Sequence, residues 1–287
     1  MRSVAAFFLA CAALTASAQT RIPDVIYLKQ AGCAYTMDVF TPKTSNHKAV
    51  VWIVSGGWFS KHEDINPGLA QAFTAKGFTV FEVVHGSQPK YTIPEIIPMV
   101  RRAIRFIRYS AATYDISPKA IGVSGASAGG HLSLEIGGLG DDGDPNAKDP
   151  VDRVSSRADA VVAFMPPTDF LNWGATGTLA LSVPGLAVFS PAFGVTAQTP
   201  KDELLKLGHD LSPITLVKAG FPPTLIVHGD KDPLVPVQQA KLIDAAFAAA
   251  GVVHKLVIVP GGGHDGITLL GGSAATLDWF NTHLPSN

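Results

Sequence analysis

Ser127 is the residue whose surroundings most favour chemistry. It lies at the centre of Gly125-Ala126-Ser127-Ala128-Gly129, after an apolar run and before a helical pattern. A serine at a sharp strand-to-helix turn needs residues with almost no side chain two positions before and after it, because the turn otherwise fails to close. Its hydroxyl then projects at the start of a helix, where unpaired N–H groups and the positive dipole end favour negative charge. The pattern predicts a nucleophilic serine, and a structural glycine-rich turn is the alternative.

A serine hydroxyl is a poor nucleophile at neutral pH unless a base takes its proton and a carboxylate orients that base. For a serine in this kind of turn, the acid and then the histidine follow along the chain. Asp232 lies in the loop after one later apolar run, 224–228, and His264 lies in the glycine-rich loop after the next. We therefore expect Ser127, Asp232 and His264 to be the catalytic residues, with Asp230 as the competing acid. The other eight histidines lie at less suitable positions.

Reaction at a carbonyl also needs hydrogen-bond donors for the oxygen that becomes negative. The apolar run 49–54 ends in Ser55-Gly56-Gly57-Trp58, where paired glycines leave backbone N–H groups accessible. We expect an oxyanion hole formed by Gly56, Gly57 and Ala128, the residue after the serine. A plain turn is the alternative for the two glycines.

Buried strands and amphipathic helices alternate along most of the chain. Near-continuous apolar runs, typical of strands covered on both faces, lie at 49–54, 78–84, 120–124, 158–164, 224–228 and 255–259. Helical patterns lie at 68–76, 93–112, 128–139, 237–250 and 273–283. This alternation predicts an α/β fold with a mostly parallel sheet between helices, and 24–28 and 35–40 predict an antiparallel hairpin at its edge.

The segment 166–213 interrupts this alternation. It carries Phe170, Trp173, Phe189 and Phe193 among Gly, Pro and Thr residues, with weak periodicity. A long irregular insertion of this kind is usually a functional cap, and four large aromatic side chains argue against a freely exposed loop. We expect a cap or lid, with Phe170 and Trp173 binding substrate together with Trp58.

Residues 1–18 have the pattern of a secretory signal peptide. Arg2 precedes an apolar run at 4–14, and Ala16-Ser17-Ala18 is typical of a cleavage site. The run is too short to span a membrane, and the alternatives are a buried N-terminal helix and a lipoprotein signal at Cys11, which the apolar sequence beyond Cys11 disfavours. We expect 19–287 to form a single domain that is secreted or periplasmic.

Composition excludes several classes of function. The chain has 287 residues, with 22 Lys and Arg against 23 Asp and Glu, so no basic excess exists to bind nucleic acid. Two cysteines rule out a disulfide framework and a cysteine-based zinc site. Four arginines on the helix at 93–112 and the acidic loop 141–152 are interpreted as solvated surfaces. The loop resembles the start of a calcium-binding EF-hand, but Ala147 and Arg153 replace the glycine and glutamate that such a site needs. We expect no metal and no cofactor.

Several motifs together resemble the α/β-hydrolase superfamily over nearly the whole of 19–287. The serine turn looks like the nucleophile elbow of the esterase branch that includes hormone-sensitive-lipase-like and bacterial acetylxylan and feruloyl esterases. The segments His228–Pro236 and Tyr35–Pro42 are similar to that branch's acid loop and N-terminal strand. Val54-Ser55-Gly56-Gly57-Trp58 departs from the branch's usual His-Gly-Gly-Gly-Trp by lacking the histidine and the first glycine.

The resemblance implies an α/β-hydrolase fold and a serine carboxylic-ester hydrolase that acts through an acyl-enzyme. Its implied substrates are acetyl or feruloyl esters of polysaccharides, or other small esters. A prolyl-oligopeptidase-like peptidase and a non-catalytic binding protein on a hydrolase scaffold are the alternatives. The sequence leaves the acyl group, the alcohol and the oligomeric state open.

Overall fold

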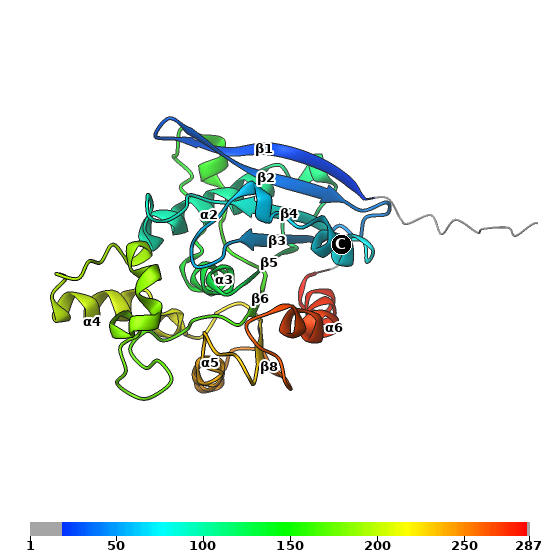
Figure 1. Ribbon diagram of the computed structural model, residues 1–287. Coiled ribbons are helices and arrows are strands. Elements are labelled where there is room, and N and C mark those ends of the chain that lie inside the picture. The colour runs from blue at the N-terminus through cyan, green and yellow to red at the C-terminus, as the bar shows by residue number, and fades with distance from the viewer. Residues whose placement is uncertain (1–18, 286–287) are drawn as a thin grey trace, which may run out of the picture.

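A central eight-stranded sheet organises the chain in the computed structural model, which describes residues 19–285 (Figure 1). The strand order is β1-β2-β4-β3-β5-β6-β7-β8. β1 and β2 form the antiparallel hairpin expected at one edge, β2 pairs antiparallel with β4, and all other pairs are parallel. The predicted α/β class is confirmed. The proposed signal peptide at 1–18 lies outside the described residues.

The observed elements lie close to the expected ranges. The strands are β1 Thr20–Gln30, β2 Cys33–Thr41, β3 Ala49–Val54, β4 Thr79–Val84, β5 Ile121–Ala126, β6 Ala160–Phe164, β7 Thr224–Gly229 and β8 His254–Val259. The α-helices are α1 Pro67–Thr74, α2 Ile93–Tyr109, α3 Ala128–Leu139, α4 Lys201–Asp210, α5 Gln238–Ala249 and α6 Gly266–His283. Within 19–285, no helix combines the length and the apolar character that a membrane span requires.

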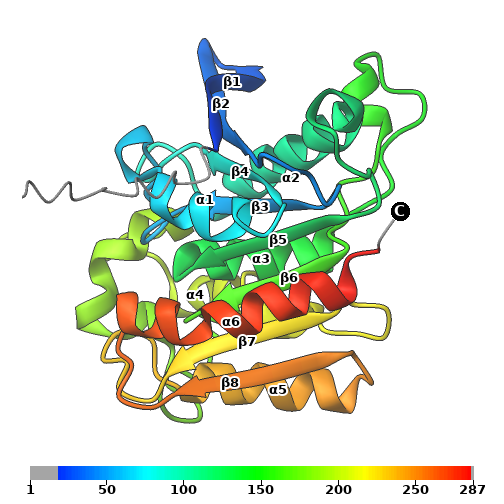
Figure 2. The same cartoon turned by 90° about the vertical axis from the view of Figure 1, so that its right-hand side faces the viewer.

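Helices cover both faces of the sheet, as Figure 2 shows. Successive side chains of β3 alternate between two cores, because strand residues point to opposite faces in turn. Val51 packs in the core beneath α2, α3 and α5, whereas Val50 packs in the core beneath α1 and α6. This double burial explains why the parallel strands read as continuous apolar runs.

Helix α6 begins seven residues before the predicted start at 273. Its first turn is capped by the Asp265 side chain, which accepts hydrogen bonds from the N–H groups of Ile267 and Thr268. Two glycines in the next turn, Gly271 and Gly272, hide the helical pattern. They allow close packing, because a Cβ on Gly271 or Gly272 would lie 2.6 or 2.5 Å from a valine side chain of the sheet.

The segment between β6 and β7 is more regular than expected. It contains a 3₁₀ segment at Pro184–Phe193 and the ten-residue helix α4, in addition to short turns. Phe170 and Phe193 are buried and the other two aromatic residues are half-buried, so the expectation that these rings are not freely exposed is confirmed.

The interpretation of the arginines of α2 and the acidic loop as solvated surfaces was wrong. Arg101 and Arg105 both pair with Asp141, and Arg102 pairs with Asp149 and Asp152 at 2.6 Å each. The guanidinium groups also bind loop carbonyl oxygens: Arg105 donates to Val154 and Arg108 to Ser155. The two features fold against each other, because each supplies the charge that the other lacks.

We expect Arg105→Met to lower the free energy of unfolding by about 1–3 kcal/mol, because the Val154 carbonyl loses its arginine donor and the Asp141 carboxylate loses one of its two. Urea denaturation would measure the change. Arg157→Met is the matched control, since Arg157 pairs with the fully exposed Asp142 and water screens that pair. An equal or larger loss in the control would contradict a special role for the α2 arginines.

Candidate active site

Ser127 lies at a strained turn between β5 and α3. Its backbone has φ +55° and ψ −119°, a conformation that residues other than glycine rarely adopt. The two flanking glycines are required by contact: a Cβ on Gly125 would lie 2.5 Å from the carbonyl carbon of Gly129, and one on Gly129 would lie 2.6 Å from Ile53 O. The Ser127 N–H donates to Phe164 O at 2.8 Å, which fixes the turn to the end of β6.

Asp232 and His264 meet at the carboxyl end of the sheet. The His264 Nδ1 atom lies 2.7 Å from Asp232 Oδ2. The other carboxylate oxygen, Oδ1, accepts the N–H groups of Leu234 and Val235, each at 2.9 Å. Since a carboxylate only accepts, Nδ1 carries the proton in this pair, and Nε2 is left free to act as a base.

Several donors hold Asp232 in its charged form. Burial by itself raises the pKa of this carboxyl group, but hydrogen bonds from His228, His264 and the Val235 N–H outweigh it and lower the pKa well below its usual range. His228 lies 3.5 Å from Asp232 Oδ2 and is completely buried, and its Nε2 also lies 2.9 Å from Val235 O. The competing acid Asp230 is exposed and accepts the Gly261 N–H.

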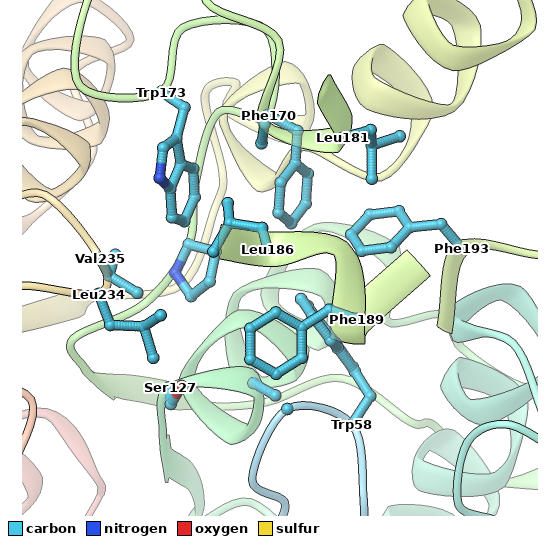
Figure 3. A pocket seen from close by; sticks show the side chains of 14 residues that line it. Trp58, Ser127, Phe170, Trp173, Leu181, Leu186, Phe189, Phe193, Leu234 and Val235 are labelled. Carbon is cyan, nitrogen blue, oxygen red and sulfur yellow. The ribbon is translucent and has the colours of Figure 1, made fainter. Parts of the chain in front are cut away.

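Ser127 and the acid loop share one cavity (Figure 3), although Ser127 and His264 make no hydrogen bond in the described part of the chain. The parallel strands β5, β7 and β8 bring all three predicted residues to the same sheet edge. Hydrogen bonds between catalytic groups are often long in structures without substrate and tighten when it binds. The hydrogen bond through which Ser127 would pass its proton to His264 therefore remains a prediction.

The cavity above Ser127 is almost entirely apolar. It is partly open to solvent, and aromatic rings from the segment 166–213 form one of its walls (Figure 3). All three predicted substrate-binding residues, Trp58, Phe170 and Trp173, line it. The remaining lining residues are Gly57, Ser127, Ala128, Pro167, Ala180, Leu181, Leu186, Phe189, Phe193, Leu234 and Val235.

The loop after β3 forms a tight hairpin. Gly56 and Phe59 exchange both backbone hydrogen bonds at 2.9 Å, and the two residues between them, Gly57 and Trp58, have φ +57° and +61°. The expectation that Gly56 donates to the oxyanion requires correction, because its N–H already binds Phe59 O. Gly57 and Ala128 remain as candidate donors. The positive φ of Trp58 costs about 1–3 kcal/mol for a residue with a Cβ, so its surroundings must hold it.

Three further residues support the site, and the sequence did not reveal them. Gln88 holds the hairpin from outside: its side chain donates to Gly57 O at 2.6 Å, and its backbone N–H donates to Trp58 O at 3.1 Å. His131 and His228 are among the eight histidines at positions less suitable for the base, and no sequence signal predicts their supporting contacts. Only the position of His131, one helical turn after Ser127, indicated that it lies near the site.

One group of side chains could approach a metal ion. Asp24, Asp38 and His62 place one ligand atom each within 4.8 Å of one another. However, the Asp38 carboxylate already binds the Arg21 guanidinium and the Asp24 N–H. The arginine supplies the balancing positive charge, so we assign no metal to these residues.

The parallel sheet, the elbow at β5 and the His–Asp pair after β7 and β8 define an α/β-hydrolase fold. The sequence model of the BD-FAE family matches residues 37–247, and the chain belongs to that family. The matched region contains Ser127 and Asp232 and ends before His264.

Known esterases are similar to this chain in sequence and in structure. Esterase LipC of Mycobacterium tuberculosis is 28% identical over 246 residues, which cover 84% of this chain and 59% of LipC. An acetylxylan esterase of Xylanibacter ruminicola is 32% identical over 130 residues, 43% of this chain and 26% of that protein. A solved truncated carbohydrate esterase from gut microbiota has 26% identity and a TM-score of 0.76, covering 94% of this chain and 98% of that one. The chain spans 42% to 59% of the length of three mycobacterial relatives.

Proposed function

We propose that this protein is a serine carboxylic-ester hydrolase with Ser127 as nucleophile and His264 and Asp232 as its base and orienting acid. The observation that carries the proposal is the 2.7 Å contact between His264 and Asp232 at the sheet edge where the strained Ser127 turn lies. The similarity to named esterases supports the same reaction.

In the proposed reaction, Ser127 Oγ attacks the ester carbonyl while His264 Nε2 takes the hydroxyl proton. Asp232 keeps the proton on Nδ1 and stabilises the imidazolium that forms. The N–H groups of Gly57 and Ala128 bind the oxyanion, and each such donor is typically worth about 3 kcal/mol in the transition state. His264 then protonates the alkoxide leaving group, and water hydrolyses the acyl-enzyme.

The proposed substrates are acetyl or feruloyl esters of polysaccharides, or other small esters. The names of the acetylxylan and carbohydrate esterase relatives support a carbohydrate ester. The apolar lining of the cavity suits an acyl group without charge. The proposal also includes export of the protein, which the pattern of residues 1–18 supports. Its substrates would then lie outside the cytoplasm.

The direct test is hydrolysis of p-nitrophenyl esters, acetylxylan, methyl ferulate and a peptide substrate by the purified protein, together with labelling by a fluorophosphonate probe. We expect ester turnover and one label, which mass spectrometry maps to Ser127. Folded protein that neither hydrolyses esters nor takes the label would contradict the proposal. Faster cleavage of the peptide would favour a peptidase instead.

A further inference from the structure

Contacts of its side chain help the hairpin bonds and Gln88 to hold Trp58 in its strained backbone conformation. The indole is 4% exposed and makes edge contacts with the rings of Phe189 and Phe193, with centroids 6.0 and 5.2 Å away. Its Nε1–H donates to His131 Nδ1 at 3.3 Å. Trp58 directly follows Gly57, so a displacement of the Trp58 backbone moves the peptide beside the proposed oxyanion donor.

The hydrogen bonds of His131 specify a single tautomer. His131 is completely buried on α3, and its Nε2 lies 2.9 Å from the carbonyl oxygen of Leu211 in the cap segment. A carbonyl only accepts, so Nε2 carries the proton and Nδ1 accepts from the indole. Burial lowers the pKa of His131 to about 4. Burial also raises the pKa of Glu135, which lies 3.7 Å from His131, to about 8. Both side chains are therefore neutral at neutral pH.

We infer that His131 is a positioning residue, whose two ring nitrogens connect the oxyanion loop at Trp58 and the cap at Leu211 to the helix that follows Ser127. This inference rests on the proposed function, because it explains how the Gly57 and Ala128 N–H groups stay directed at the same oxyanion. The imidazole touches neither substrate nor reacting atoms, and it acts through Trp58.

Two variants separate the two hydrogen bonds of His131. In His131→Asn, the amide oxygen can replace Nδ1 as acceptor for Trp58, but the group is too short to reach Leu211. In His131→Gln, the longer amide can donate to Leu211 O, but no acceptor remains for Trp58. We expect His131→Gln to lower kcat about tenfold or more, with KM within about twofold, because a small misplacement of a catalytic donor is costly. We expect His131→Asn to keep kcat within about threefold despite a lower Tm.

Trp58→Phe removes the donor and keeps an aromatic ring. We expect it to lower kcat as His131→Gln does, and the double variant to lose little more, because both changes break one hydrogen bond. A His131→Gln variant with the kcat of the wild type would overturn the inference. A loss of kcat that simply parallels the loss of Tm across all the variants would overturn it too. If the wild type hydrolyses no ester, the proposed function fails. The positioning role of His131 is then tested by a crystal structure of His131→Gln. An unmoved Gly56–Phe59 hairpin would overturn that role, and a displaced hairpin would support it.

Discussion

Ser127→Ala should reduce kcat for p-nitrophenyl acetate by about 10⁴–10⁶-fold, because it removes the atom that we propose attacks the carbonyl. The fold should persist, since Ser127 Oγ makes no hydrogen bond within the described residues, and alanine keeps the backbone bond to Phe164 O. Residual turnover above that in water would reflect the oxyanion donors and substrate binding alone. The fluorophosphonate label should disappear with the hydroxyl.

Ser273→Ala is the matched control for this variant. Ser273 is an exposed hydroxyl on α6 that donates to Leu270 O within its own helix. Its removal should leave both turnover and labelling unchanged. Full turnover in folded Ser127→Ala protein would exclude Ser127 as the nucleophile, and the assignment of the elbow would be wrong.

Asp232→Asn should lower kcat by about 10⁴-fold with little change in KM. The asparagine oxygen can still accept the N–H groups of Leu234 and Val235, so the loop keeps its shape. Its NH₂ group would then face His264 Nδ1 and force that nitrogen to accept. The proton would move to Nε2, which could no longer take one from Ser127.

The same variant tests the charge of this carboxylate in folding. Because folding lowers the pKa of Asp232, its stabilising effect is fully present above the pKa of an unfolded aspartate, about 3.9, and is lost as pH falls further. Asp232→Asn should remove that part of the acid dependence, as thermal denaturation between pH 2 and 7 would show.

Asp230→Asn distinguishes the two acids of the loop. Asp230 is exposed, and asparagine retains an acceptor for the Gly261 N–H. We expect kcat within about threefold of wild type, in line with surface substitutions. A larger loss in Asp230→Asn than in Asp232→Asn would reverse the assignment of the orienting acid.

Sequence patterns predicted most of the fold because its main signals are local. Apolar runs mark β3 to β8, and the burial of both faces of β3 to β7 explains why the signal is strong there. The start of α6 was missed because Gly271 and Gly272 serve packing against the sheet rather than helix formation. The arginines of α2 looked like a solvated face, since their partners lie about 36 to 51 residues away in the chain.

The candidate site was predictable where chain order and turn geometry constrain it. Ser127, Asp232 and His264 each follow a strand of a parallel sheet, and such ends meet at one edge. The hydrogen bond from the Gly56 N–H to Phe59 O was not predictable, because it depends on the conformation of the hairpin at Gly57 and Trp58. Gln88 and His131 are connected to the site by tertiary contacts, and neither residue type nor spacing reveals those.

The cap departs from the sheet after β6 and returns to it at the neighbouring strand β7. Both attachment points are fixed by sheet pairing, whereas Ser127 and His264 belong to connections that follow other strands. Exchange of this one insertion would therefore leave the strands that carry Ser127 and His264 in place, but the replacement would have to supply anew the contacts that Phe189, Phe193 and Leu211 make with Trp58 and His131.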